Sequence, residues 1–152
     1  MLETMDIAVL VPCYNEETTI ATVVRDFRNC LPDAVVCVYD INSSDQTQAQ
    51  AHQAGAVVLL EVRQGKGNVV RRMFADIEAD IYILVDGDDT YDSGAAPQML
   101  DMMIQNGADI VTARRIHKES AAYRPGHVLR NRLLTGLTAL LFNVKAPARQ
   151  AN

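Results

Sequence analysis

Short apolar runs alternate with amphipathic segments along most of the chain, and turn-forming residues separate them. Five runs have the length and the Val, Ile and Leu content of buried strands, at residues 7–12, 35–40, 56–62, 81–86 and 109–114. Between them, apolar residues recur at intervals of three and four, which is the spacing of one helix face. Because strands alternate with helices, the sequence predicts an α/β fold with a mostly parallel sheet.

The expected helices are marked by their apolar faces and by capping residues. One face of the first helix carries Ile20, Val23, Val24, Phe27 and Leu31. Asn15 suits its N-cap, and Glu16 and Glu17 suit the positive end of its dipole. The others are a short helix through Ala49 and Ala54 ended by Gly55, a helix through Val70, Phe74 and Ile77, a helix at 97–106 stopped by Gly107, and a Leu-rich helix at 128–143. The chain of 152 residues is expected to form one domain.

Polar clusters follow four of the apolar runs. They are Pro12, Cys13, Tyr14, Asn15 and Glu16 after the first, Asp40, Asn42, Ser43, Ser44 and Asp45 after the second, Gly65, Lys66 and Gly67 after the third, and Asp86, Gly87, Asp88 and Asp89 after the fourth. Taken singly, the GKG sequence is an ordinary turn and NSSDQT is an ordinary Asx turn. The carboxyl ends of parallel strands meet at one sheet edge, so we expect the four clusters to form a single ligand site.

The residue types in these clusters suit a nucleoside diphosphate and a metal ion. Asp86 and Asp88 can hold Mg²⁺ or Mn²⁺, and the metal then bridges a diphosphate. Lys66 supplies positive charge, and Gly87 removes a side chain where the ligand comes close. Asp40 can accept hydrogen bonds from a nucleoside. The GxxxxGK[ST] sequence of P-loop NTPases is absent, as is a GxGxxG after the first strand.

Composition and charge limit the compartment in which the protein is expected and the partners that it can bind. No apolar run is long enough to span a bilayer, the acidic N-terminus lacks the features of a signal peptide, and three cysteines without metal spacing suggest reduced thiols in the cytoplasm. Residues 1–100 carry 6 Lys/Arg and 16 Asp/Glu, whereas residues 101–152 carry 8 and 3. The basic end is either a set of solvated helix faces or a surface for phosphates or an acidic membrane. Nucleic acid is disfavoured, because no basic patch is interleaved with aromatic residues.

The motifs VPCYNEE, DINSSDQT, GKGNVVRRMF and LVDGDDTY resemble, in order and spacing, those of family 2 glycosyltransferases with the GT-A fold. Within that family they are most similar to the polyprenyl-phosphate branch typified by dolichol-phosphate-mannose synthase. The resemblance covers residues 6–142. It implies a Rossmann-like three-layer α/β/α fold and a metal-dependent transferase that uses a UDP- or GDP-sugar and inverts the anomeric carbon. The implied acceptor is a polyprenyl or other lipid phosphate, which is already an anion and requires no strong general base.

The resemblance also implies roles for individual residues. The implied nucleotide-sugar site comprises Pro12, Tyr14 and Glu16 at the base and ribose, Asp40 at the base, and Ser43, Lys66, Asp86, Gly87 and Asp88 around the remainder of the ligand. Asp86 and Asp88 match the DxD pair that holds the metal. Asp88 and Arg114 are the candidate catalytic residues. Arg114 resembles an arginine that this branch uses near the phosphates. Arg114, Arg130 and Arg132 are candidates for the acceptor phosphate.

The resemblance ends before the C-terminus. Relatives usually continue beyond the Leu-rich helix, whereas residues 143–152 here read as a tail, so we expect the C-terminal part of the fold to be missing. An open sheet edge and an uncovered Leu-rich helix then favour self-association. We expect a cytoplasmic protein, with peripheral attachment to the inner membrane face through a lipid acceptor.

Two alternatives remain. A shortened chain could bind a nucleotide sugar without turning it over. Alternatively, DGDDT matches the DxDxT loop of haloacid-dehalogenase-like phosphatases, with Asp86 as the nucleophile and Asp88 as the acid/base. That family also needs a downstream acidic pair, which the sequence after residue 90 lacks.

Overall fold

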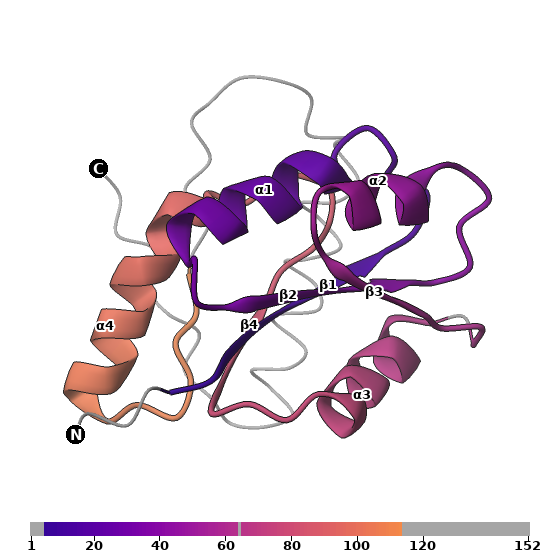
Figure 1. Ribbon diagram of the computed structural model, residues 1–152. Coiled ribbons are helices and arrows are strands. Elements are labelled where there is room, and N and C mark those ends of the chain that lie inside the picture. The colour runs from indigo at the N-terminus through magenta and orange to yellow at the C-terminus, as the bar shows by residue number, and fades with distance from the viewer. Residues whose placement is uncertain (1–4, 64, 114–152) are drawn as a thin grey trace, which may run out of the picture. The chain divides into compact units, whose positions relative to one another are not determined.

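A sheet of four parallel strands forms the centre of the domain. The computed structural model describes residues 5–63 and 65–113, and all statements on structure concern these residues. The strands are β1 (Ile7–Cys13), β2 (Val35–Asp40), β3 (Val57–Leu60) and β4 (Ile81–Leu84), arranged in the order β3-β2-β1-β4 (Figure 1). Every pair is parallel, with Val9 aligned to Val36 and to Ile83. The predicted α/β fold with a parallel sheet is confirmed.

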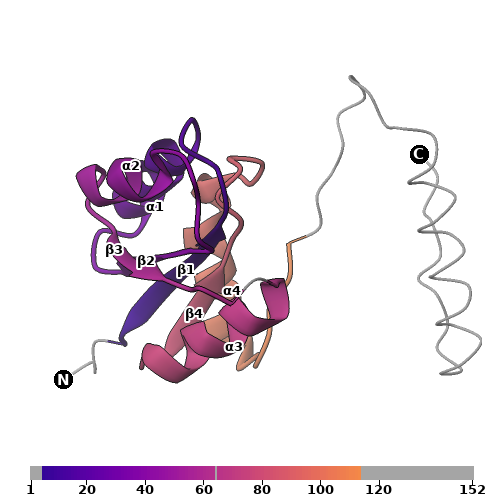
Figure 2. The same ribbon diagram turned by 90° about the vertical axis from the view of Figure 1, so that its right-hand side faces the viewer.

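Helices cover both faces of this sheet. They are α1 (Ile20–Cys30), α2 (Thr47–Gln53), α3 (Lys66–Asp76) and α4 (Ala96–Asn106), which follows a short 3-10 turn, η1 (Ser93–Ala95). Figure 2 shows α1 and α2 on one side of the strands and α3 on the other. α1, α2 and α4 contribute to one hydrophobic cluster, whereas α3 contributes to the second.

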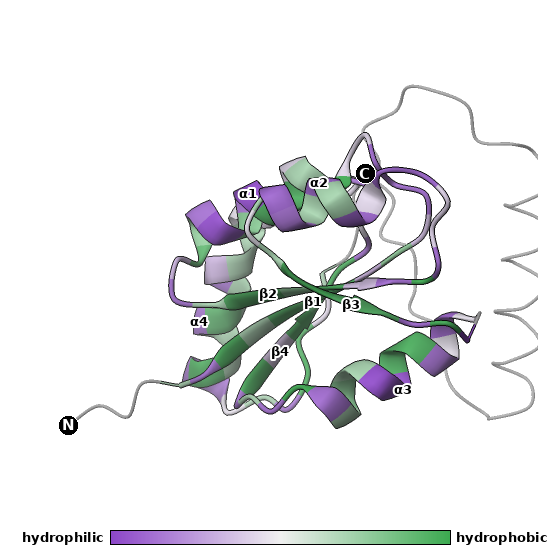
Figure 3. Cartoon of the chain, turned by 45° about the vertical axis from the view of Figure 1, so that its right-hand side comes forward, coloured by the Kyte–Doolittle hydropathy of each residue, from purple (hydrophilic) through white to green (hydrophobic). Residues whose placement is uncertain are grey.

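The two hydrophobic clusters explain why the central strands are continuous apolar runs. Val9 and Val11 of β1 point into the cluster beneath α1, and Ala8 and Leu10 point into the cluster beneath α3. Successive side chains of a strand alternate between faces, so a strand covered on both sides has no polar face. In Figure 3 the strands are accordingly hydrophobic along most of their length, whereas α3 is striped with hydrophilic residues.

The predicted strand at 109–114 is wrong for the part that the structure describes. Residues 109–113 form no strand, and the side chain of Ile110 is 82% exposed. α4 ends before Gly107, which has the left-handed φ of 58° that suits a helix C-cap, and residues 108–113 pair with neither edge of the sheet. A strand requires a partner as well as an apolar sequence. Residue 114 and the Leu-rich helix predicted at 128–143 lie outside the described residues.

Two details of the predicted helices also differ. α1 begins at Ile20 with Thr19 in the N-cap position, so Asn15 is not its cap; Asn15 instead lies in the preceding loop with a left-handed φ of 54°. In α3 the buried residues are Val69 and Met73, whereas Phe74 on the predicted face is 49% exposed. Within the described ranges, no helix combines the length and the hydropathy needed to cross a bilayer.

Candidate functional site

The loops that follow β1, β2 and β4 are joined by hydrogen bonds at one edge of the sheet. The backbone N–H of Asn15 donates to Oγ of Ser43 at 2.8 Å, and that of Glu16 donates to Oγ1 of Thr47 at 2.8 Å. Oγ1 of Thr19 donates to the carbonyl of Gly87, again at 2.8 Å. Three of the polar clusters therefore form one connected surface, as the parallel topology predicts.

The fourth cluster joins this surface through Lys66. GKG is not a free turn: Lys66 and Gly67 open α3, and Gly65 precedes the helix with a φ of 117°. Nζ of Lys66 reaches Oδ1 of Asp86 at 2.5 Å, and the two side chains are 66% and 32% exposed. The positive end of α3 and its first side chain thus lie beside the acidic loop after β4.

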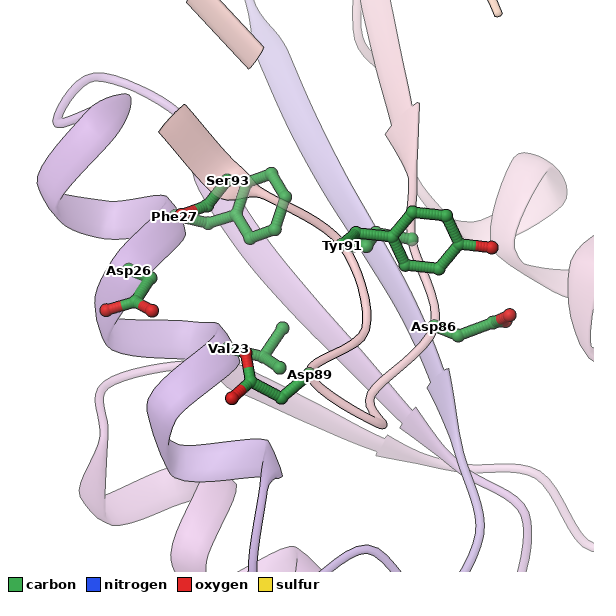
Figure 4. A pocket seen from close by; sticks show the side chains of 8 residues that line it. Val23, Asp26, Phe27, Asp86, Asp89, Tyr91 and Ser93 are labelled. Carbon is green, nitrogen blue, oxygen red and sulfur yellow. The ribbon is translucent and has the colours of Figure 1, made fainter. Parts of the chain in front are cut away.

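Two carboxylates of the DGDD sequence, those of Asp86 and Asp89, point in different directions. Figure 4 shows Asp86 and Tyr91 projecting to one side, while Asp89 turns toward α1 and Asp26. The hollow that these residues line has a volume of only about 10 Å³, the size of a single water. Oδ1 of Asp88 accepts hydrogen bonds from the hydroxyl of Thr90 at 2.6 Å and from its N–H at 3.2 Å. Asp86 and Asp88 both lie close enough to Glu16 to raise its pKa, which keeps them as the candidate ligand pair, whereas the Asp89 side chain turns toward α1.

Glu16 places a further carboxylate against this loop. Its Oε2 is buried and has no hydrogen-bond partner among the described residues. Burial, followed by the charges of Asp88 and Asp86, raises the pKa of Glu16 to about 7, and Lys66 opposes this rise. An unpaired carboxylate oxygen beside two further carboxylates marks a site with excess negative charge, which a cation would relieve.

Gly87 has a different role from the one predicted. A Cβ at this position would collide with Oε2 of Glu16, and it would approach Cβ of Cys13 at 3.1 Å and Cδ1 of Ile20 at 3.2 Å. The space left by the missing side chain is therefore filled by residues of the β1–α1 segment, not left open for a ligand. Gly87 allows the loop after β4 to pack on Glu16.

The unusual pKa of Glu16 makes stability depend on pH. The folded state binds the Glu16 proton more tightly than the unfolded chain does, so this contribution is complete below pH 4.5 and is lost as pH rises through 7. One pKa unit corresponds to about 1.4 kcal/mol, and Glu16 is only partly buried, so we expect the free energy of unfolding to fall by about 2 kcal/mol between pH 5 and pH 8. Urea titrations in the presence of a chelator measure this dependence.

Glu16→Gln should remove most of this pH dependence. Glu78→Gln, at an exposed position, changes the net charge equally and is the matched control. If Glu16→Gln retained the full fall in stability, another group would be responsible for it.

The remaining predicted residues of the nucleoside pocket are placed as follows. Pro12 is buried within β1, and Tyr14 is 51% exposed at the rim. Asp40 is completely buried, and its Oδ2 accepts hydrogen bonds from the N–H of Ser43 at 3.0 Å and from Nε2 of Gln48 at 2.7 Å. Asp40 therefore orders the loop after β2, and a ligand would reach its carboxylate only by displacing the Gln48 amide. Arg114, Arg130 and Arg132 lie outside the described residues.

Sequence reasoning missed the residues that connect the loops. Thr19, Thr47 and Gln48 each bond to a residue of another segment or to Asp40, and Asn15 accepts a hydrogen bond from the N–H of Ser44 at 2.9 Å. The density of hydroxyl and amide residues in these loops was the available signal. Their partners are up to 68 residues away in sequence, so only the folded arrangement identifies them.

The donor set fits a hard divalent cation that also binds the ligand's oxygens. Asp86 and Asp88 offer carboxylates, the preferred ligands of Mg²⁺ and Mn²⁺. Among the described residues, no three His, Cys, Asp or Glu side chains are arranged to hold a metal by themselves. Mg²⁺ commonly takes one or two protein carboxylates and completes its shell with phosphates and water. The two aspartates match that kind of site, and the unpaired Glu16 oxygen beside them adds to its negative charge.

Comparisons with known proteins identify the family. The model of "Glycosyl transferase family 2" matches residues 8–150. Protein RfbJ of Shigella flexneri is 48% identical over 128 residues, which cover 84% of this chain and 99% of RfbJ. A dolichyl-phosphate hexose transferase of Haloferax volcanii is 33% identical over 74% of this chain and 49% of its own length.

A solved relative supports the fold. The glucosyl-3-phosphoglycerate synthase of Mycobacterium tuberculosis, crystallised with Mn²⁺, UDP-glucose and phosphoglyceric acid, is 28% identical with a TM-score of 0.67. The match covers 90% of this chain and 50% of the synthase, so this chain spans nearly all of RfbJ but about half of the other two proteins. The four-stranded parallel sheet, the ordered motifs and the family match agree: the chain belongs to glycosyl transferase family 2 and is a glycosyltransferase-type domain with the GT-A fold.

Proposed function

We propose that this chain binds a UDP- or GDP-sugar together with Mg²⁺ or Mn²⁺ and transfers the sugar, with inversion, to a phosphate-bearing acceptor. The observation that carries the proposal is the meeting of Lys66, Asp86, Asp88 and the unpaired Glu16 oxygen at one sheet edge. An ammonium group, the start of a helix and two carboxylates suit a diphosphate with its counter-cation. The family match makes the glycosyl donor the natural source of that diphosphate.

In this proposal each group has a defined task. Asp86 and Asp88 hold the metal, which when bound stabilises the charge of the leaving diphosphate. Lys66 and the N-terminus of α3 attract the diphosphate oxygens. Asp40 accepts a hydrogen bond from the base, and Pro12, Tyr14 and Ser43 line the nucleoside side of the site. Arg114 remains a candidate for the phosphates, and Arg130 and Arg132 for the acceptor.

A feature that two relatives share supports the proposed acceptor. One is a dolichyl-phosphate hexose transferase, and the other was crystallised with phosphoglyceric acid. Dolichyl phosphate and phosphoglyceric acid both carry a phosphate group. We therefore propose a phosphate-bearing acceptor and, on the motif resemblance, a lipid phosphate at a membrane surface. Peripheral attachment to the inner membrane face and self-association stay predictions. The phosphatase alternative has no further support, because the glycosyl transferase family 2 match covers residues 8–150, which include DGDD.

Calorimetric titration with UDP and GDP, with and without Mn²⁺, tests the proposal. We expect Mn²⁺ to strengthen binding of one nucleotide, and we expect Asp86→Asn/Asp88→Asn to weaken binding in Mn²⁺ by at least about tenfold, or roughly 1.4 kcal/mol. Asp89→Asn is a control from the same loop, because its carboxylate points toward α1 (Figure 4), and it removes one negative charge where the double variant removes two. Equal losses in the two variants would move the metal away from Asp86 and Asp88, and no binding by folded wild-type protein would contradict the proposal.

A further inference from the structure

The carboxylate of Asp86 is bound to a cation of the protein itself. Nζ of Lys66 lies 2.5 Å from its Oδ1, a short charge-assisted hydrogen bond between α3 and the loop after β4. The other two ion pairs among the described residues join Arg72 to Glu61 and to Asp76, away from this loop. Lys66 is therefore the counterion of the proposed metal ligand when no ligand is present.

The surroundings of Lys66 keep it charged. Asp86, Asp88 and Tyr91 of the loop after β4 favour the ammonium form, and the Glu16 carboxyl of the β1–α1 segment also interacts with its charge. The hydrogen bond to Asp86 raises the pKa of Lys66, so the ammonium persists throughout the neutral pH range. The site thus presents a permanent positive charge against one oxygen of the proposed metal ligand.

An ammonium group and a divalent cation compete for the Asp86 carboxylate, because two positive charges close to one carboxylate repel each other. A metal ion that binds through Oδ1 would displace Lys66 from that oxygen. Displacement is feasible, because the Lys66 side chain is 66% exposed and carries its charge on a flexible four-carbon stem. The nearest new partner would be a diphosphate at the N-terminus of α3, where Lys66 is the first helical residue.

We infer that Lys66 is an exchangeable counterion that couples metal binding to nucleotide binding. In the ligand-free site it occupies Asp86 and suppresses binding of the metal alone. When the diphosphate arrives, Lys66 transfers to the phosphate oxygens and releases Asp86 for the metal. Metal and nucleotide then favour each other's binding by the same factor, as linkage requires. This inference rests on the proposed nucleotide-sugar site and adds an order of events to it.

The metal-only affinity of Lys66→Met tests the exchange. Removing the competing charge should tighten Mn²⁺ binding in the absence of nucleotide by about threefold, the scale of an exposed ion pair. The same variant should bind the preferred nucleotide about tenfold more weakly in saturating Mn²⁺, because the phosphate loses a charge-assisted hydrogen bond. Titration of Mn²⁺ by electron paramagnetic resonance and calorimetry of the nucleotide give the two values.

Arg71→Met is the matched control, because it removes one positive charge from the same helix without touching Asp86. Its Mn²⁺ affinity should stay within about twofold of wild type, which separates displacement of Lys66 from a general change in net charge. Lys66→Arg keeps the charge and should keep metal binding suppressed. Thermal unfolding should place both Lys66 variants close to wild type, because exposed ion pairs contribute little to stability.

The outcomes separate this inference from the proposed function. Suppose that wild-type protein binds Mn²⁺ and a nucleotide, but Lys66→Met binds Mn²⁺ alone no more tightly than wild type. The proposed exchange of Lys66 is then wrong, and the proposed nucleotide-sugar site is unaffected. The same holds if Arg71→Met tightens Mn²⁺ binding as much as Lys66→Met does. If folded wild-type protein binds neither Mn²⁺ nor UDP nor GDP, the proposed function fails and the exchange fails with it.

Discussion

Replacing Met73 by Ala is expected to lower the free energy of unfolding by about 3 kcal/mol, within the usual range for a buried Met-to-Ala change. Met73 is completely buried and packs with Val69 in the hydrophobic cluster beneath α3. Among the described residues, α3 is the helix that contributes to this cluster, so little else can close the cavity. Urea unfolding monitored by circular dichroism measures the loss.

Two further variants make this prediction specific. Met102→Ala removes the same atoms from α4, where the side chain is 50% exposed, and should cost less than about 1 kcal/mol. Phe74→Ala removes a larger side chain that is 49% exposed and makes an edge-on contact with Tyr82 at 5.0 Å between ring centroids. We expect it to cost about 1 kcal/mol. A larger loss for Phe74→Ala than for Met73→Ala would mean that α3 packs through its other face.

The position of α3 has consequences for the site as well as for stability. Lys66 is the first residue of this helix, and Val69 and Met73 anchor it to the sheet. The contact between Lys66 and Asp86 therefore depends on packing that lies one and two turns further along the helix. We expect Met73→Ala protein, at temperatures where it remains folded, to show weaker metal-nucleotide coupling than Met102→Ala protein.

The sequence predicted the existence of α3 but not its buried face, and the reason is geometric. Val69 and Val70 are adjacent, as are Met73 and Phe74, so two apolar stripes at helical spacing lie side by side. Periodicity cannot choose between stripes that are one residue apart. The choice depends on where Gly65 starts the helix and on the angle at which the helix meets the sheet.

The strands were predictable where burial on both faces made them continuously apolar. β1 is the clearest case, because β2 and β4 flank it and helices cover both of its faces. The run at 109–114 has a similar composition, yet residues 109–113 form no strand, because strand formation also depends on a partner edge. Local sequence carries no information on whether that partner is available.

The candidate site was predictable as a set of clusters but not as a set of contacts. The parallel topology alone brings the four strand ends together, and the structure confirms this through the hydrogen bonds between their loops. The packing of Glu16 on Gly87 joins residues from β1–α1 and from the loop after β4. Such a contact is a property of the folded arrangement, so the sequence suggested room for a ligand where a protein carboxylate in fact lies.

Asp40→Asn is expected to reduce both stability and nucleotide affinity. The carboxylate is completely buried, and one oxygen accepts both the Ser43 N–H and the Gln48 amide. An asparagine keeps one acceptor oxygen, but its NH₂ group replaces the second oxygen in a buried position where the carboxylate could only accept hydrogen bonds. We therefore expect a loss of about 2–3 kcal/mol in the free energy of unfolding. Asp101→Asn, at an exposed position of α4, changes the net charge equally and should cost less than about 0.5 kcal/mol.

The effect of Asp40→Asn on binding follows from the Gln48 contact. The Gln48 N–H donates to Asp40 at 2.7 Å, and we expect a ring N–H of the base to take its place when the nucleotide binds. Loss of a hydrogen bond to a charged acceptor should weaken UDP or GDP binding about tenfold or more, measured by calorimetry well below the unfolding temperature. Unchanged affinity in a destabilised variant would restrict Asp40 to ordering its loop. In that case the base would be held by Tyr14 and the loop backbone.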